Sequence, residues 1–351
     1  MTEPDDSGRS SRRWAVSVLQ WVVALGAFWF VARDLDWGAT AAALGDISAV
    51  VVAAVLAVTA LEFCARFAMW YVLVNGLVDA SLATTARVDL VIKFVNHVVP
   101  SKAAGHSVAP LVLRHYTGVE WSDAVGLAGA NTALYAALYG ATALSGVAYF
   151  GPLTGRLSGG WLLVLVFSTG IYVAAGALVL LAGRRMDVAG RLVARLGGVL
   201  RRVPRVGDRL AGVAGALPSF TDDSAATLRD LTSRPGVLVP YALGWMGNLV
   251  VLPGLRVVLV LGALGGGFSP PALAGVALVA AYSVTVLPLT PGGVGVAEAS
   301  ATAVLVGLGV APELAAVAVL VDRTLGVYLP ALLGWIPSAR VDLAEVVAAE
   351  T

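Results

Sequence analysis

The chain has 351 residues, of which 58% are hydrophobic and 13% charged, and its formal net charge is +1. With a mean hydropathy of +0.86, this composition excludes a water-soluble fold, which needs a charged exterior. The long apolar runs exclude a β-barrel, which shows short alternating segments instead. The single cysteine, Cys64, excludes an intramolecular disulfide and a cysteine-based metal site.

Apolar runs of about 20 residues, long enough to cross a bilayer, recur along almost the whole sequence. The region 80–118 is more polar and is interrupted by Pro and Gly, so we expect it to re-enter rather than cross. The sequence predicts an all-α polytopic membrane protein with about eight transmembrane helices and two re-entrant or broken segments. The expected spans are 14–32, 47–74, 122–150, 161–182, 237–264, 271–289, 294–310 and 313–336. They form a single domain over 14–336, between tails at 1–13 and 337–351.

Arginine placement predicts the orientation in the membrane. Three arginines precede the first run, which we interpret as an uncleaved helix rather than a signal peptide, and ten more lie in residues 184–234 against five acids. Both termini and the Arg-rich loop 184–235 are therefore expected on the cytoplasmic side of the cell membrane. Between Arg184 and Arg209, apolar residues recur at helical spacing opposite the arginines, which predicts a helix lying on the anionic inner leaflet. Nucleic-acid binding is the weaker alternative, because the loop has no aromatic stacking platform.

Two broken segments resemble each other. "VVPSKAAGHSVA" (98–109) matches "VLPLTPGGVGVA" (286–297), with Pro100 against Pro288 and Gly105 against Gly293. Hydrocarbon cannot satisfy the backbone groups exposed at such breaks, so the breaks lie inside protein or beside a water-filled cavity. Further on, "GVEWSDA" (118–124) resembles "GVAPELA" (309–315), and Asn131 and Asp322 follow these two stretches at a common offset. The pattern favours an internal repeat, and paired broken segments in transporters point to a site near the midplane.

Ionisable residues inside the apolar runs need a reason, because charge in hydrocarbon is costly. Glu62 and Arg66 are four residues apart and are expected to pair on one helix face. Glu298 opens a helix, near the positive end of the helix dipole. Each such residue, Arg256 included, has a simpler interpretation as part of an ion pair that seals two helices. Together with Lys102 and Arg114 they predict a cationic cavity with balancing acids, suited to an anionic headgroup such as phosphate.

Catalytic and metal-binding signatures do not emerge from the sequence. His97, His106 and His115 are nine residues apart with prolines and a glycine between them, which disfavours a metal site. No Walker loop, nucleophile elbow or HExxH motif occurs. We expect no cofactor, no metal and no enzymatic activity.

Four stretches resemble the membrane domain of lysylphosphatidylglycerol synthase and its flippase-like relatives: "ARFAMWYVLVNGL", "FVNHVVPSKAAGHSVAPLVLRHYTG", "LPLTPGGVGVAEASATAVLVGLGV" and "VLVDRTLGVYLPALLG". The resemblance covers 14–336. It implies an eight-crossing helical domain with re-entrant hairpins that moves lipids with modified headgroups between leaflets. Some relatives are fused to, or work beside, glycosyltransferases that act on polyprenyl-linked sugars. Aminoacyl transfer resides in a separate soluble domain and is not expected of this chain.

The motif match assigns candidate site residues. In this resemblance Arg66 and Trp70 correspond to an Arg-aromatic pattern, and Asp322 with Arg323 to an acid-Arg pair. Where the family often has a comparable pair in the first half, this chain has Asn131 and Thr132. The candidate substrate-binding residues are Arg66, Lys102, Gly105, His106, Arg114, Gly292, Gly293, Gly295, Glu298, Asp322 and Arg323, and the structural hairpin residues are Pro100, Pro288 and Pro291.

Three functional hypotheses follow. The first is a lipid translocase for an anionic lipid or a polyprenyl-phosphate-linked sugar, in which Lys102, Arg114 and Arg66 hold the phosphate. The second is a non-transporting membrane partner of a glycosyltransferase. The third is an intramembrane lipid-headgroup transferase, for which Glu62, Glu298 and His106 are the candidate acids and bases.

Overall fold

The structure is a computed structural model that describes residues 22, 26, 38, 45–98, 102–150, 162–177, 222–287 and 289–339, with 98 and 102–107 as backbone only. Within these ranges every regular element is a helix and no strand occurs, which confirms the all-α class. Most of the predicted first span, most of the Arg-rich loop, Pro100 and Pro288 lie outside the described residues.

Four helical stretches of 27 to 30 residues are long and apolar enough to cross a membrane. At 1.5 Å per residue they measure roughly 40–45 Å, more than the hydrocarbon thickness of about 30 Å. They coincide with the predicted spans 47–74, 122–150, 237–264 and 313–336. Two are single helices, α3 (Ala49–Asn75) and α6 (Trp121–Phe150). The other two contain π-helical turns: α9 (Pro235–Met246), η2 (Gly247–Val251) and α10 (Leu252–Ala263), then α13 (Pro312–Arg323), η6 (Thr324–Tyr328) and α14 (Leu329–Ser338).

The broken segments form two pairs of shorter helices. The first helical pair is α4 (Leu82–Val98) with α5 (Lys102–Thr117). The second helical pair is α11 (Ala274–Tyr282) with α12 (Val296–Gly307); it also contains the 3-10 turns η3 (Pro271–Leu273), η4 (Ser283–Val286) and η5 (Pro291–Gly293). At 12 residues, α12 measures about 18 Å and is too short to cross the hydrocarbon core alone. The count of eight crossings therefore stays a prediction.

Local sequence explains where the helices begin. The Ser48 hydroxyl accepts a hydrogen bond from the Val51 N–H at 3.4 Å and so caps α3. Pro235 and Pro312 occupy first-turn positions, where the missing N–H would have no helical partner anyway. The Glu298 carboxylate accepts from the Gly295 N–H at 2.7 Å at the start of α12. That last cap places a carboxylate inside the bundle.

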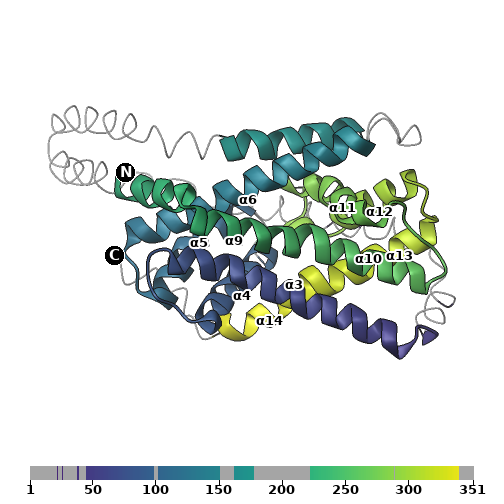
Figure 1. Cartoon of the computed structure of the whole chain (residues 1–351), viewed down its shortest axis with the longest axis horizontal. Helices are drawn as coiled ribbons and strands as arrows, with labels where there is room; N and C mark the ends of the chain where they lie inside the picture. Colours follow the sequence, from purple (N-terminus) through teal and green to yellow (C-terminus); the bar gives the residue numbers. More distant parts are fainter. Residues whose placement is uncertain are drawn as a thin grey trace, which may run out of the picture.

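Each helical pair packs on a long helix from the other half of the sequence. The first pair packs through α4 on α14, and the second pair packs through α11 on α6. The long helices α3 and α10 lie against each other between them. The first pair lies toward one end of the long axis and the second pair toward the other (Figure 1). The bundle is therefore assembled by reciprocal packing of its two halves.

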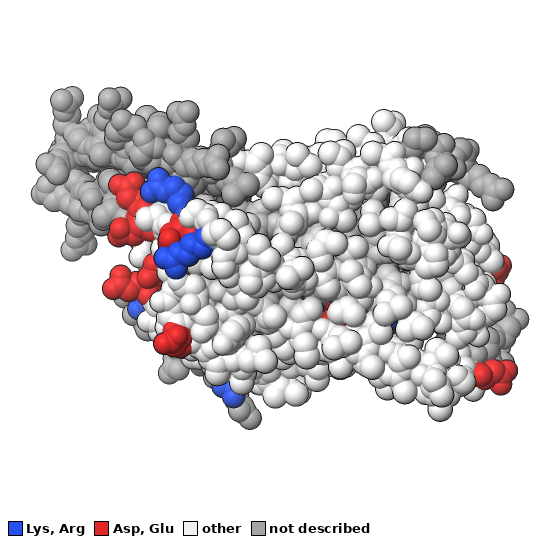
Figure 2. Space-filling view, in the orientation of Figure 1, with Lys and Arg blue, Asp and Glu red and all other residues white. Residues whose placement is uncertain are grey.

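The surface of the bundle is suited to a bilayer. Large apolar side chains such as Leu61, Leu243, Leu332 and Trp335 are exposed, which marks a surface that contacts lipid or protein. On the face shown in Figure 2, charged side chains of the described residues gather at the two ends, and the broad middle is almost free of them. The protein is a membrane-embedded, multi-pass helical protein.

Candidate functional site

Eight charged side chains come together inside the apolar bundle. They are contributed by α3, α4, α10, α12 and α13, and seven of them are between 0 and 6% exposed. This charge cluster consists of Glu62, Arg66, Asp89, Lys93, Arg256, Glu298, Asp322 and Arg323. The four cations balance the four acids formally. Because uncompensated charge at membrane depth costs several kcal/mol, close pairing of opposite charges is what makes the cluster tolerable.

Arg256 joins two carboxylates from different helices. Its Nη1 contacts a carboxylate oxygen of Glu62 on α3, and its Nε donates to Asp322 Oδ1 at 3.0 Å. The Thr59 hydroxyl accepts from the same guanidinium at 3.3 Å, and Tyr282 donates to Asp322 Oδ2 at 2.9 Å. One guanidinium thus holds α3, α10 and α13 together through charge-assisted hydrogen bonds.

Glu298 and Arg323 form the second ion pair. Arg323 Nε donates to Glu298 Oε1 at 2.8 Å, and Tyr328 donates to the same oxygen. The guanidinium carbon lies 5.3 Å from the centroid of the Tyr282 ring and 5.5 Å from that of Tyr328. Since Glu298 also caps α12, the predicted carboxylate at a helix start is confirmed, and its charge is favoured there by the helix dipole.

Arg66 forms the third ion pair, with Asp89 on α4. The two atoms, Arg66 Nε and Asp89 Oδ2, are 2.8 Å apart without hydrogen-bond alignment, while Nη1 donates to the Gly326 carbonyl at 3.3 Å. The predicted pairing of Glu62 with Arg66 is wrong. Both side chains extend from α3, but each finds an opposite charge on a different helix, so the pairs connect helices instead of bracing one.

Two glycines allow the backbone to approach the charge cluster. A Cβ on Gly326, in the π-turn η6, would lie 2.6 Å from Arg256 Nη2 and 2.9 Å from Glu62 Oε1. Gly292 has φ +60°, and a Cβ there would lie 2.6 Å from the His97 ring. His97 Nδ1 is 2.8 Å from the Lys93 carbonyl oxygen. The turn of the second helical pair therefore touches the end of α4. The π-turn that holds Gly326 is of a kind that is frequent at functional sites.

The structure unites some of the predicted site residues and separates others. Arg66, Glu298, Asp322 and Arg323 belong to the charge cluster, and the Gly295 N–H bonds to Glu298. Pro291 and Gly293 are buried in the turn that holds Gly292.

The remaining predicted residues lie on α5. Arg114 is exposed near the end of α5, with its guanidinium carbon 4.9 Å from the Trp121 ring centroid. Lys102, Gly105 and His106 lie in α5, where only the backbone is described.

The predicted substrate-binding residues do not include four members of the charge cluster: Glu62, Asp89, Lys93 and Arg256. Glu62 and Arg256 are recognisable in the sequence as intramembrane charges, but the motif match does not place them in the substrate-binding set. Asp89 and Lys93 are four residues apart in a largely apolar stretch, a spacing that puts both on one helix face. That spacing was the available signal.

The corresponding position in the first half of the chain is neutral. Tyr241 donates to Asn131 Oδ1 at 2.9 Å, much as Tyr282 donates to Asp322. The amide needs no counter-charge, so Asn131 and Tyr241 form a neutral hydrogen-bonded pair there.

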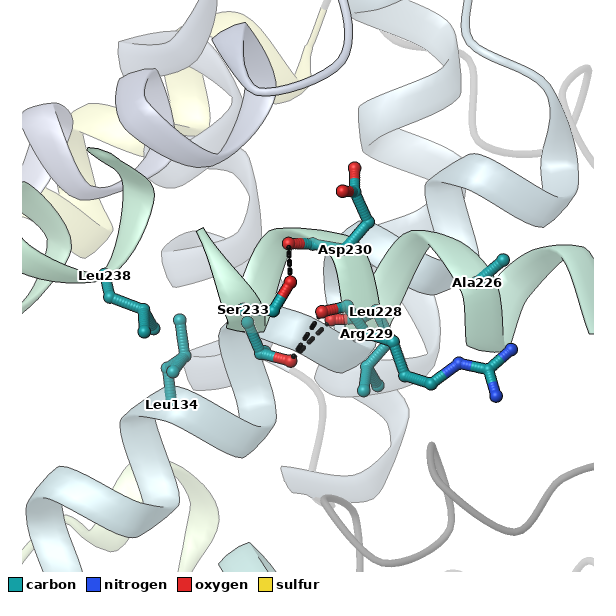
Figure 3. Close-up of a pocket in the computed structure, with 8 residues that line it drawn as sticks. Leu134, Ala226, Leu228, Arg229, Asp230, Ser233 and Leu238 are labelled. Atoms are coloured by element: carbon teal, nitrogen blue, oxygen red, sulfur yellow. Dashed lines mark hydrogen bonds between the residues drawn. The ribbon is translucent and has the colours of Figure 1, made fainter. Parts of the chain in front are cut away.

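A separate pocket of about 740 Å³ opens between α6, the helical residues 222–233 and α9. Figure 3 shows Leu134 and Leu238 on one side of it, and Leu228 with the polar residues Arg229, Asp230 and Ser233 on the helix that lines it. None of its lining residues belongs to the charge cluster.

A bundle of long apolar helices with a compensated charge cluster at its centre defines a polytopic membrane protein with an internal polar site. Comparison with protein families matches residues 17–334 to the family described as "Lysylphosphatidylglycerol synthase TM region". The chain belongs to this family. No curated protein and no solved structure matches this chain significantly.

Proposed function

We propose that the protein is a lipid translocase of the flippase-like type, acting on an anionic lipid or a polyprenyl-phosphate-linked sugar. The observation that carries the proposal is the charge cluster. Ionisable residues inside membrane bundles are rare and mark substrate pathways. Here eight of them meet inside the bundle, and α4 of the first helical pair and α12 of the second both contribute.

The reciprocal packing of the two halves supports the proposal. The sequence of contacts α3–α4–α5–α6 matches α10–α11–α12–α13, and the α4–α14 contact corresponds to the α11–α6 contact. With the helical pairs toward opposite ends of the bundle (Figure 1), this is the arrangement expected of an inverted repeat with two re-entrant hairpins. Transporters built in this way hold their substrate near the midplane, at the interface of the repeats.

The chemistry of the cluster suits a lipid with a negatively charged, hydroxyl-bearing headgroup. Guanidinium groups bind phosphate oxygens, carboxylates accept hydrogen bonds from sugar hydroxyls, and tyrosine hydroxyls can donate to them or accept from them. In this proposal the lipid tails remain among the exposed apolar side chains of the bundle. Both termini face the cytoplasm, the segment from Arg184 to Arg209 rests on the inner leaflet of the cell membrane, and a glycosyltransferase that makes the lipid-linked sugar is a candidate partner.

The test is lipid movement in vesicles reconstituted with the purified chain. Fluorescent phosphatidylglycerol, fluorescent phosphatidylcholine and a polyprenyl-phosphate sugar are compared, with protein-free vesicles as the blank. We expect the chain to move an anionic lipid. Arg323→Gln should slow the movement strongly, whereas Arg234→Gln, an equal charge loss at an exposed position, should not.

Other outcomes would favour the alternative hypotheses. If folded wild-type protein moves none of these lipids, the non-transporting partner of a glycosyltransferase becomes the better hypothesis. If mass spectrometry instead shows a covalently altered headgroup, the intramembrane lipid-headgroup transferase becomes the better hypothesis. Glu62 and Glu298, two of its three candidate acids and bases, are held in ion pairs with arginines.

A further inference from the structure

Two guanidinium groups of the charge cluster have hydrogen-bonding capacity that no other described residue uses. The Nη2 atoms of Arg66 and Arg323 are both buried and have no hydrogen-bond partner in the described part of the chain. The side chains themselves are 4% and 7% exposed. Leaving a buried charged donor unsatisfied costs free energy, so buried guanidinium edges of this kind call for an acceptor.

The two arginines are held in the same way. In each case a carboxylate engages the Nε side of the guanidinium: Asp89 lies 2.8 Å from Arg66 Nε, and Glu298 lies 2.8 Å from Arg323 Nε. The guanidinium carbon of Arg66 lies over the Phe63 ring, 4.7 Å from its centroid, and that of Arg323 lies over the Tyr328 ring at 5.5 Å. These contacts fix the orientation of both groups and leave an Nη2 edge of each available.

Lys93 supplies a third positive charge one helical turn from Asp89 on the same face of α4, and Asp89 in turn contacts Arg66. Its ammonium group lies within electrostatic range of Arg66, Asp89 and Arg323. Unlike the other members of the charge cluster, Lys93 is only half-buried. It therefore combines a position within electrostatic range of both guanidinium groups with some exposed surface.

The charges within the cluster are distributed unevenly. Arg256 is shared by two acids, Glu62 and Asp322. The three cations Arg66, Lys93 and Arg323 are left with the two acids Asp89 and Glu298. This part of the cluster carries one excess positive charge although the cluster as a whole is neutral.

We propose that Arg66, Lys93 and Arg323 form a phosphate-binding site inside the bundle. The inference deepens the proposed function and rests on it, since it assigns the phosphate group of the transported lipid to this site. Guanidinium edges match the geometry of phosphate oxygens, and an ammonium adds a compact point charge. Asp89 and Glu298 orient the two arginines, and the bound phosphate neutralises the excess charge. The source of the phosphate is either a lipid headgroup or the free anion.

Binding of inorganic phosphate to the full chain in detergent micelles tests the site. The titration is followed by calorimetry at constant ionic strength. We expect saturable binding to wild type, at least about tenfold weaker binding to Lys93→Gln, and recovery in Lys93→Arg. Arg87→Gln is the matched control, because Arg87 lies exposed on the same helix and its loss changes the net charge equally. Absence of binding to wild type, or equal binding by wild type and Lys93→Gln, would overturn the site.

A competition arm distinguishes the two sources. Phosphatidylglycerol added to the micelles should displace phosphate if the headgroup is the occupant, and diacylglycerol, which lacks phosphate, should not. Competition by neither lipid would overturn the assignment to a headgroup and identify the free anion as the occupant.

The vesicle assay separates this proposal from the translocase. Phosphate binding without lipid movement would support the site and contradict the translocase. Lipid movement without phosphate binding would support the translocase and contradict the phosphate-binding site.

Discussion

Removal of Arg256 should destabilise the bundle strongly, and the loss should be repaired by removing its acidic partners. Arg256 is 1% exposed and serves both Glu62 and Asp322, each 3% exposed. Arg256→Met leaves two buried carboxylates without their shared cation. Breaking a buried ion pair in this way costs about 3–5 kcal/mol, chiefly because the remaining charge has no counter-charge. The triple variant Glu62→Gln/Arg256→Met/Asp322→Asn should return to within about 1 kcal/mol of wild type, because neutral amides need no counter-ion.

The assay is equilibrium unfolding in mixed micelles of a mild detergent and dodecyl sulfate, with helical content as the signal. Wild type, the single variant and the triple variant are compared at one protein concentration. A single variant within about 1 kcal/mol of wild type would show that the ion pairs around Arg256 are not needed for folding. A triple variant less stable than the single one would refute the explanation by unpaired charge.

Three further substitutions have distinct expected outcomes. Gly326→Ala places a methyl group 2.6 Å from Arg256 Nη2. This variant should lower the free energy of unfolding in mixed micelles by about 1–3 kcal/mol and slow lipid movement. Wild-type stability and wild-type lipid movement would contradict the close packing around Gly326. Gly292→Ala combines φ +60° with a contact to the His97 ring at 2.6 Å. The free energy of unfolding in the same assay should fall by at least about 1 kcal/mol. An unchanged free energy of unfolding would show that this turn relaxes freely. Arg114→Gln removes an exposed cation at the end of α5; it should slow movement of anionic lipid at low salt and not at high salt, and salt-independent slowing would place Arg114 in the buried site instead.

The long helices could be predicted because each depends on a single local property. A run of apolar residues as long as the bilayer is thick defines a span wherever it occurs, and α3 and α6 begin and end within two residues of the predicted spans. The break at Thr290 to Gly295 was visible for the same reason, because Pro and Gly act locally on the backbone.

Partner choice within the charge cluster could not be predicted, because it depends on which helices lie side by side. The spacing of Glu62 and Arg66 indicated a pair on one helix. In the structure Glu62 instead meets Arg256, which is 194 positions away. The role of Asp89 was hidden for a similar reason, since its partner Arg66 lies on the preceding helix, α3. Long-range packing of the two halves decides these pairs, and this packing cannot be predicted from a single sequence.

The most direct test of the central claim compares two glutamates in reconstituted vesicles. Glu298 is fully buried and bonds to Arg323, Tyr328 and the Gly295 N–H, whereas Glu313 is exposed in the first turn of α13. Movement of fluorescent phosphatidylglycerol is measured for wild type, Glu298→Gln and Glu313→Gln, after size-exclusion profiles have shown that each is folded. If the charge cluster is the pathway of the headgroup, Glu298→Gln loses movement and Glu313→Gln retains the wild-type rate. Equal rates for all three folded proteins would contradict the account.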